Sequence, residues 1–188
     1  LGTPALTTRG FKEDDIRLAK WYTQQLKELR VPVYYHTTVT KERAADGNYD
    51  TVIVATGSEP KVFSLGEDEK VFTATQVLNG EKDAGNNTVI VGGGLVGCET
   101  ALWLAAHGKN VTIVEALDKI LAVNGPLCHS NKEMLEKLIP YKNINVITNT
   151  KVIGYQDNIL TASADGKEVQ ISCDSVILSI GYKENSSL

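Results

Sequence analysis

Cysteine is scarce in this chain, with three among 188 residues, and no two cysteines form a C-x-x-C pair. This spacing excludes a redox-active dithiol motif and the usual cysteine motifs for zinc or an iron–sulfur cluster within the chain. A sparse, odd set of cysteines is typical of a reducing compartment, so we expect a cytoplasmic protein. The three are Cys98, Cys128 and Cys173, and Cys98 is interpreted as a small buried helix residue.

Long apolar runs and an excess of positive charge are also lacking. No apolar stretch approaches the roughly 20 residues that span a bilayer, and the chain has neither an initiator methionine nor a charged signal-peptide start. The net charge of −4 argues against nucleic acid as a main partner. We therefore expect neither a membrane nor a nucleic acid as partner, and a sequence cut from a longer protein.

Histidine is equally scarce, and His36, His107 and His129 show no metal-ligand or catalytic-triad spacing. The sequence therefore predicts no metal site and no acid–base catalyst for a substrate. Trp21 and Trp103 are interpreted as packing residues. The composition, 42% hydrophobic and 22% charged, is that of an ordinary globular protein with one medium domain or two small ones.

Residues 88–115 carry the most specific motif, a strand, a glycine turn, a helix and a second strand that ends in an acid. The glycines form the G-x-G-x-x-G fingerprint of dinucleotide-binding domains. The first glycine permits the sharp turn, the second lets a pyrophosphate approach the backbone, and the third lets the helix pack closely on the sheet. With the pyrophosphate at the helix N-terminus, the predicted cofactor-binding residues are Gly92, Gly93, Gly94, Leu95, Val96 and Gly97.

Two acids accompany this motif. Glu115 lies 18 residues beyond Gly97, where a carboxylate can accept hydrogen bonds from the adenosine ribose hydroxyls. An ordinary exposed strand-end acid is the alternative. A carboxylate there repels a 2′-phosphate, which predicts NAD(H) rather than NADP(H), although Lys119 is nearby. Glu99 lies in the first turn of the helix, where it would stabilise the positive end of the helix dipole.

The residues before the fingerprint predict several elements. Residues 12–30 have a helical apolar stripe, and Pro32 restricts the extended residues 31–35 to a sheet edge or strand start. Residues 50–55 are apolar and rich in β-branched side chains, which is typical of a buried parallel strand. Residues 58–70 are interpreted as a linker and residues 74–78 as a short helix.

The residues after Glu115 predict a mixed structure. A helix is expected near residues 130–138, stopped by Pro140, and a strand at residues 145–148. Residues 151–173 are typical of antiparallel β-structure, with a hairpin turn at residues 164–167. The apolar run at residues 174–181 repeats the pattern of residues 50–57, and the two runs bracket the complete βαβ unit.

This bracketing predicts an α/β fold with two parts. A Rossmann-like, three-layer nucleotide-binding domain, with a parallel sheet and a β-meander, is expected at residues 70–180. It would be inserted in a second lobe formed by residues 1–62 and 181–188.

The ATG run at residues 55–57, the GGGxxGxE motif and the second D-x-V-I-x-x-I-G run resemble the two-dinucleotide-binding-domain flavoproteins. That group includes the disulfide reductases, the NADH oxidases and the NADH:flavin oxidoreductases. The chain is most similar to the last of these, the 2-enoate and 2,4-dienoyl-CoA reductase type. The similar segments in the first lobe include Tyr22, Leu26 and Val31, residues 36–40, and residues 49–60.

This resemblance implies that one lobe holds FAD and that the inserted lobe binds NADH. Electrons would pass from NADH to FAD, then through a 4Fe-4S cluster to FMN in a separate barrel, and FMN would reduce an activated carbon–carbon double bond. Val39 would meet the FAD adenine through its backbone, and Glu99 would lie near the nicotinamide. The residues expected at the seam between the lobes are Ala55, Thr56, Gly57 and Gly181.

The chain also departs from that pattern. It lacks the glycine fingerprint that opens the FAD lobe, the Gly-Asp segment that closes it, the cluster cysteines and the barrel, and Glu184 stands where a proline is common. We therefore expect the remainder of its own polypeptide as partner, and neither tight FAD binding nor turnover by this chain alone. Two alternatives stay open: a fragment of an NADH oxidase or disulfide-reductase-like flavoprotein, and a dinucleotide-binding module without enzymatic activity.

Overall fold

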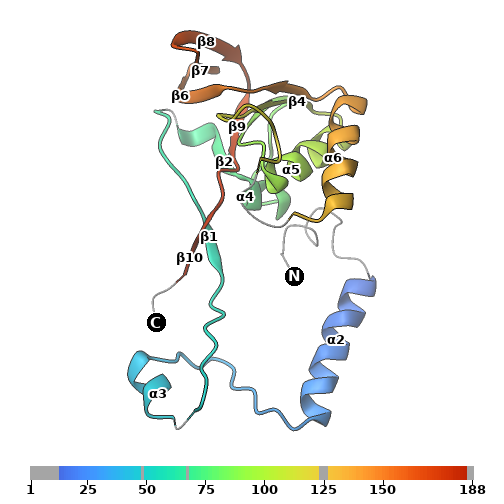
Figure 1. Cartoon of the computed structure of the whole chain (residues 1–188), viewed down its shortest axis with the longest axis vertical. Helices are drawn as coiled ribbons and strands as arrows, with labels where there is room; N and C mark the ends of the chain where they lie inside the picture. Colours follow the sequence, from blue (N-terminus) through green and yellow to red (C-terminus); the bar gives the residue numbers. More distant parts are fainter. Residues whose placement is uncertain (1–12, 48, 67, 123–126, 186–188) are drawn as a thin grey trace. The chain divides into compact units, whose positions relative to one another are not determined.

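The computed structural model describes residues 13–47, 49–66, 68–122 and 127–185. Contacts divide the chain into two compact units: the sheet unit, residues 60–182, and the helical unit, the described residues of 13–59 and 183–185. The chain passes between them through a two-stranded ribbon of β1 (Ser58–Pro60) and β10 (Tyr182–Glu184) (Figure 1). Within the described ranges, no helix is both long enough and apolar enough to cross a bilayer.

The sheet unit is built around five parallel strands. Four of them fall on runs predicted as strands, whereas the edge strand at residues 71–73 was not predicted. The glycine turn leaves the central strand of this sheet and leads through a helix to the neighbouring strand. In spatial order the strands are β2 (Val71–Thr73), β9 (Ser175–Leu178), β3 (Asn87–Val91), β4 (Asn110–Val114) and β5 (Asn145–Ile147).

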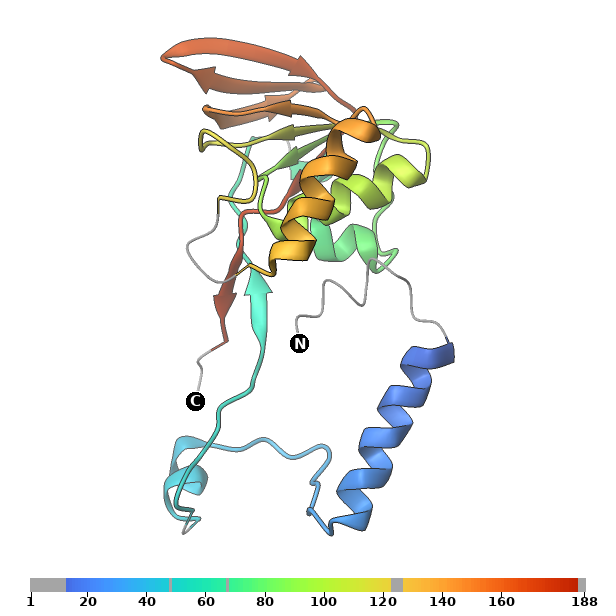
Figure 2. The same ribbon diagram turned by 45° about the vertical axis from the view of Figure 1, so that its right-hand side comes forward.

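Alternate residues of the central strands point to opposite faces of the sheet. On one face, Ile90, Ile113 and Ile177 are fully buried against a layer of helices. Figures 1 and 2 show that layer on one side of the sheet. It consists of α4 (Ala74–Leu78), α5 (Leu95–Ala106) and α6 (His129–Tyr141).

The other face of the sheet is covered by an antiparallel meander. Val89 and Val176, neighbours in sequence of the buried isoleucines, pack there with Leu160 of the meander. Asp165 and Gly166 have positive φ angles of 51° and 76°, which suit the predicted two-residue hairpin turn. The expected three-layer α/β architecture is confirmed, with a meander of β6 (Thr150–Gln156), β7 (Ile159–Ala164) and β8 (Lys167–Ser172).

The helical unit contains α2 (Glu13–Glu28) and α3 (Lys41–Ala45). The side chain of Thr40 caps α3 by accepting a hydrogen bond from the Arg43 amide at 3.3 Å. The apolar stripe predicted for residues 12–30 lies on α2 but is exposed to solvent, and residue 12 lies outside the described residues.

Two strand predictions in the helical unit are wrong. Residues 31–35 and 50–55 form neither helix nor strand, and Ile53 is 85% exposed. A strand rich in apolar residues needs a neighbouring strand to satisfy its amides, and no described strand of this unit pairs with either segment.

Two further boundaries differ from the predictions. Helix α6 continues through Pro140 and ends one residue later, at Tyr141, so the predicted stop lies at the helix end but not before the proline. The expected linker at residues 58–70 contains strand β1 and a 3₁₀ turn, η1 (Asp68–Lys70).

Candidate dinucleotide-binding site

A groove of about 1060 Å³ lies where β3, β4 and β9 end. Ligands of open parallel α/β sheets bind at this edge, where the connections leave the central strands in opposite directions. We call it the glycine-turn groove. Among the residues predicted to bind the cofactor, its lining includes Gly92, Gly94, Leu95, Val96, Glu115 and Gly181.

The three fingerprint glycines have different surroundings. A side chain on Gly92 would collide with the Ser179 carbonyl, and the φ angle of Gly92 is +106°. A side chain on Gly97 would collide with the carbonyl of Gly92, so the start of α5 lies directly against the turn. Gly94 has no atom within 4 Å of the position that a Cβ would take, and it faces the groove. These surroundings match the separate tasks of turn, close packing and ligand approach.

The N-terminus of α5 is open to the groove. Gly94 is its N-cap residue and makes no side-chain capping hydrogen bond. Leu95 and Val96 of the first turn line the groove. Unpaired amides and the positive end of the helix dipole therefore face this space, an arrangement that favours a phosphate group.

Glu115 is bonded to the glycine turn. Its Oε2 accepts a hydrogen bond from the Gly93 amide at 2.6 Å, and its Oε1 accepts one from the Leu117 amide at 2.9 Å. A carboxylate offers about four acceptor positions, so about two remain for hydroxyl groups in the groove. Glu115 is half-buried rather than a fully exposed strand-end acid.

Beneath the turn, the Cys98 thiol is fully buried and donates to the Gly93 carbonyl at 3.4 Å. Burial and the neighbouring carboxylates of Glu115 and Glu99 raise the pKa of Cys98 to about 12. The thiol is thus a protonated packing group, as expected for a small buried helix residue. Glu99 is half-buried and does not line the groove. It is the fifth residue of α5, whose first turn contains no acid, so the predicted position in the first turn is wrong.

The three cysteines should differ sharply in reactivity. Hydrogen bonds from Ser130 and from the amides of Asn131 and Ser130 lower the pKa of the exposed Cys128. Burial raises the pKa of Cys173 to about 11. Because the thiolate is the reactive form, iodoacetamide at neutral pH should label Cys128 first, and its rate should rise at lower pH than for free cysteine. Mass spectrometry would check this order.

Replacing Ser130 by alanine should raise the pH at which Cys128 becomes reactive, because the 3.1 Å contact between Sγ and the Ser130 hydroxyl is lost. Equal labelling of Cys98 and Cys128 in the folded protein would contradict this assignment.

The other predicted residues lie in the helical unit. Val39, Ala55 and Thr56 line a cavity of about 900 Å³, the second-unit cavity, together with Lys41 and Arg43. Gly57, next to it in sequence, has a φ angle of +83°, and its carbonyl accepts the Asn185 amide at 3.0 Å. Most of the predicted residues thus line one of two cavities, one in each unit. The predicted residues that line neither cavity are Gly57, Gly93, Gly97 and Glu99.

Sequence reasoning missed the contribution of the meander to the glycine-turn groove. Alternation along β6 could have placed Lys151 and Val152 on opposite faces. Nothing in the sequence showed that β6 would meet the groove, with Val152 as well as Lys151 in its lining, since that depends on how the meander crosses the sheet. The missed lining residues include Phe63, Thr150, Lys151, Ile153 and Ser163. Across the described ranges, no three His, Cys, Asp or Glu side chains gather in a way that could hold a metal ion.

Comparisons with known proteins agree with this geometry. Residues 17–188 match the model of the pyridine nucleotide-disulphide oxidoreductase family. Cinnamate reductase from Clostridium sporogenes is 42% identical over 178 residues, which cover 95% of this chain and 27% of that protein. NADH oxidase from Thermoanaerobacter brockii is 35% identical, over 86% of this chain and 25% of its own length.

A solved structure of 2-naphthoyl-CoA reductase has the same fold, with a TM-score of 0.74 and 24% identity over 93% of this chain and 26% of that one. The chain spans about a quarter of the length of the curated relatives named here. The resemblance to the enoate-reductase type is confirmed by the match to cinnamate reductase. The chain belongs to the pyridine nucleotide-disulphide oxidoreductase family, flavin-dependent oxidoreductases that contain an NAD(P)-binding domain.

Proposed function

We propose that this chain is the NADH-binding portion of a flavin-dependent oxidoreductase that reduces an activated carbon–carbon double bond. The observation that carries the proposal is the glycine-turn groove. It combines an open approach at Gly94, an uncapped helix N-terminus and a half-buried carboxylate, Glu115. The 42% identity to cinnamate reductase supports the choice of reaction.

Each part of the groove has a proposed task toward NADH. The amides at the start of α5 hold the pyrophosphate, which passes over Gly94. Glu115 accepts hydrogen bonds from the adenosine ribose while its bond to the Gly93 amide keeps the turn in place. The far end of the groove, near Ser179 and Gly181, receives the nicotinamide. When bound, NADH supplies the hydride that FAD accepts.

The helical unit is proposed to contribute to the FAD site. The second-unit cavity is large enough for part of a nucleotide, and Lys41 and Arg43 add positive charge to its lining. Val39, Ala55 and Thr56 are the proposed contacts. In this assignment residues 70–180 are the NADH domain, and residues 1–62 and 181–188 belong to the FAD lobe.

FMN, the 4Fe-4S cluster and the substrate site are proposed for the remainder of the polypeptide, since the chain spans about a quarter of its curated relatives. The full-length protein should be yellow, with a flavin absorption band, and should contain iron. A yellow protein without iron would favour an NADH oxidase or disulfide-reductase relative. A colourless protein that binds NADH would favour a module without enzymatic activity.

Replacing Glu115 by glutamine tests the ribose assignment. The variant should bind NADH less tightly, by about three- to tenfold, because hydrogen bonds to an ionised acceptor are about twice as strong as neutral ones. It should bind NADPH more tightly than the wild type does, because the charge that repels a 2′-phosphate is gone. Calorimetric titration of both nucleotides into the 188-residue chain measures the ratio of the two affinities.

Glu133→Gln is the matched control, since Glu133 lies on α6 outside the groove lining and pairs with His129 at 3.6 Å. It should leave both affinities unchanged. An NADH-to-NADPH ratio that Glu115→Gln does not alter would contradict the role of Glu115. Absence of NADH binding by the folded wild-type chain would contradict the proposed function itself.

A further inference from the structure

Strand β6 brings a lysine to the glycine-turn groove. The amide of Thr150 donates to the carbonyl of Glu115 at 2.9 Å, so the start of β6 lies against the end of β4. Lys151 follows directly and lines the groove together with Glu115. Ser163, its partner across the antiparallel pair, lines the groove as well. This face of the meander is opposite to the one that packs in the core.

The ammonium group of Lys151 has no bonded partner in the described part of the chain. Its side chain is exposed and makes no hydrogen bond or ion pair within the described residues. Two other lysines of the sheet unit do have partners: Lys70 donates to Asn158 at 2.8 Å, and Lys109 to the Ala84 carbonyl at 2.8 Å. Lys151 is thus a free cation in a cavity whose other charged lining residue is an acid, Glu115.

We propose that Lys151 is a cofactor-selecting residue, which attracts a 2′-phosphate at the adenosine end of the groove and so opposes Glu115. This inference rests on the proposed NADH site. Glu115 follows the end of β4, and Lys151 lies near the start of β6, which is hydrogen-bonded to Glu115. Both charges therefore act on the same part of a bound dinucleotide. The difference in binding free energy between NADH and NADPH then depends on two opposing effects on the 2′-phosphate, repulsion by Glu115 and attraction by Lys151.

A second position for the ammonium group is the pyrophosphate, which both nucleotides share. Contact there would strengthen NADH and NADPH binding alike. The hydrogen bond from the Thr150 amide to the Glu115 carbonyl places the residue before Lys151 beside Glu115, which favours the adenosine end. The two positions differ in a measurable way, because only the adenosine end distinguishes the two nucleotides.

The test is titration of NADH and NADPH into the 188-residue chain carrying Lys151→Ala. NADPH affinity should fall about three- to fivefold, the size expected for one solvent-exposed ion pair, with NADH changed less than about twofold. The loss should shrink in about 1 M salt, where the Debye length is about 3 Å. In the Glu115→Gln background, NADPH binding should depend on Lys151 in the same direction.

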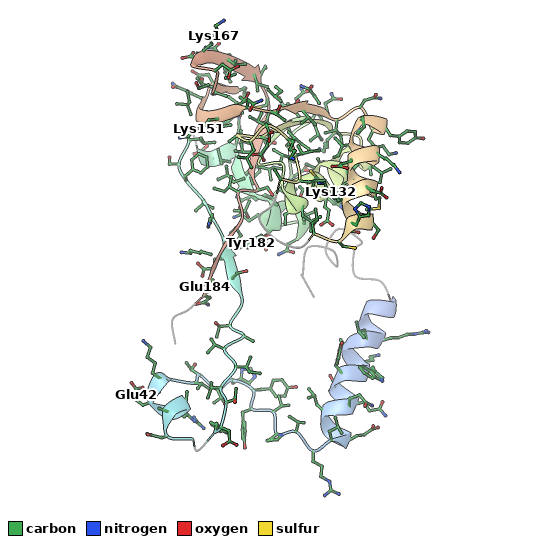
Figure 3. The ribbon with its side chains drawn as sticks, viewed as in Figure 1. Glu42, Lys132, Lys151, Lys167, Tyr182 and Glu184 are labelled. Carbon is green, nitrogen blue, oxygen red and sulfur yellow. The ribbon has the colours of Figure 1, made fainter. Side chains whose placement is uncertain are left out.

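Lys167→Ala is the matched control. Lys167 is an exposed lysine at the start of β8 in the same meander, outside the groove lining (Figure 3). It should change neither affinity. An equal loss for NADH and NADPH in Lys151→Ala would place the lysine at the pyrophosphate and overturn the inference. A variant indistinguishable from Lys167→Ala would overturn it too. If the wild-type chain bound neither nucleotide, the proposed function would fail instead.

Discussion

Replacing Gly97 by alanine is expected to destabilise the sheet unit and to abolish NADH binding together. The added methyl group would collide with the backbone carbonyl of Gly92, and the next nearest atom is the carbonyl carbon of the same residue. A flexible side chain could move aside, but these atoms belong to the glycine turn. The start of α5 must therefore move away from the turn, and the amides that face the groove move with it.

The clash outweighs the gain in helix propensity. Alanine is about 1 kcal/mol better than glycine inside a helix, whereas overpacking against rigid neighbours costs typically about 1–3 kcal/mol and occasionally more. Collision with the backbone carbonyl group of Gly92, which cannot rotate away as a side chain could, places this site at the upper end of that range. We expect a net loss of about 2 kcal/mol, which corresponds to a fall in Tm of roughly 5–10 °C.

Thermal unfolding and NADH titration on the same preparation measure both effects. Ser130→Ala, on α6, is a suitable control because Ser130 is exposed and lies outside the groove lining. A Gly97→Ala chain with unchanged Tm and unchanged NADH affinity would show that the close approach of α5 to the turn is not required.

The parallel sheet could be predicted because its signals are local. The runs that became β3, β4 and β9 are apolar and β-branched, and the glycine turn has a single common use between a strand and a helix. The hairpin turn at Asp165 and Gly166 was predictable for the same reason, since few sequences adopt two successive positive φ angles.

The rest depends on contacts between distant segments. Residues 50–55 have the composition of a buried strand, yet pairing requires neighbours that composition does not reveal, and Ile53 is exposed. Pro140 predicts the end of a helix, but the sequence did not show that α6 would include the proline in its last turn. Lys151 is indistinguishable in sequence from any strand lysine until β6 is seen against β4.

Part of the candidate site could also be predicted from local sequence signals. The spacing of Gly92, Gly94 and Glu115 predicted residues that the structure brings to one groove. It did not predict that the Glu115 carboxylate would accept a hydrogen bond from the Gly93 amide. This bond joins the proposed ribose position to the proposed pyrophosphate position through one side chain.

Replacing Gly94 by alanine is expected to separate binding from stability, in contrast to Gly97. The position of the added methyl group is free of protein atoms within 4 Å, and the φ angle of Gly94 is −71°, which alanine adopts readily. An alanine N-cap costs less than about 1 kcal/mol relative to glycine, and the smaller entropy of the unfolded chain offsets part of that cost. The Tm should therefore stay within a few degrees of the wild type.

Binding should suffer instead, because the methyl group points into the space that the pyrophosphate is proposed to cross. NADH affinity should fall about 10- to 100-fold, since overpacking by one methyl group costs about 1–3 kcal/mol. Gly94→Val should weaken binding further without a matching loss of Tm, because the open space admits the larger side chain. Titration of NADH into both variants, with thermal unfolding in parallel, measures this contrast. Affinity that survives in Gly94→Val would mean that the dinucleotide does not pass over the glycine turn, and the pyrophosphate would then have to be placed elsewhere in the groove.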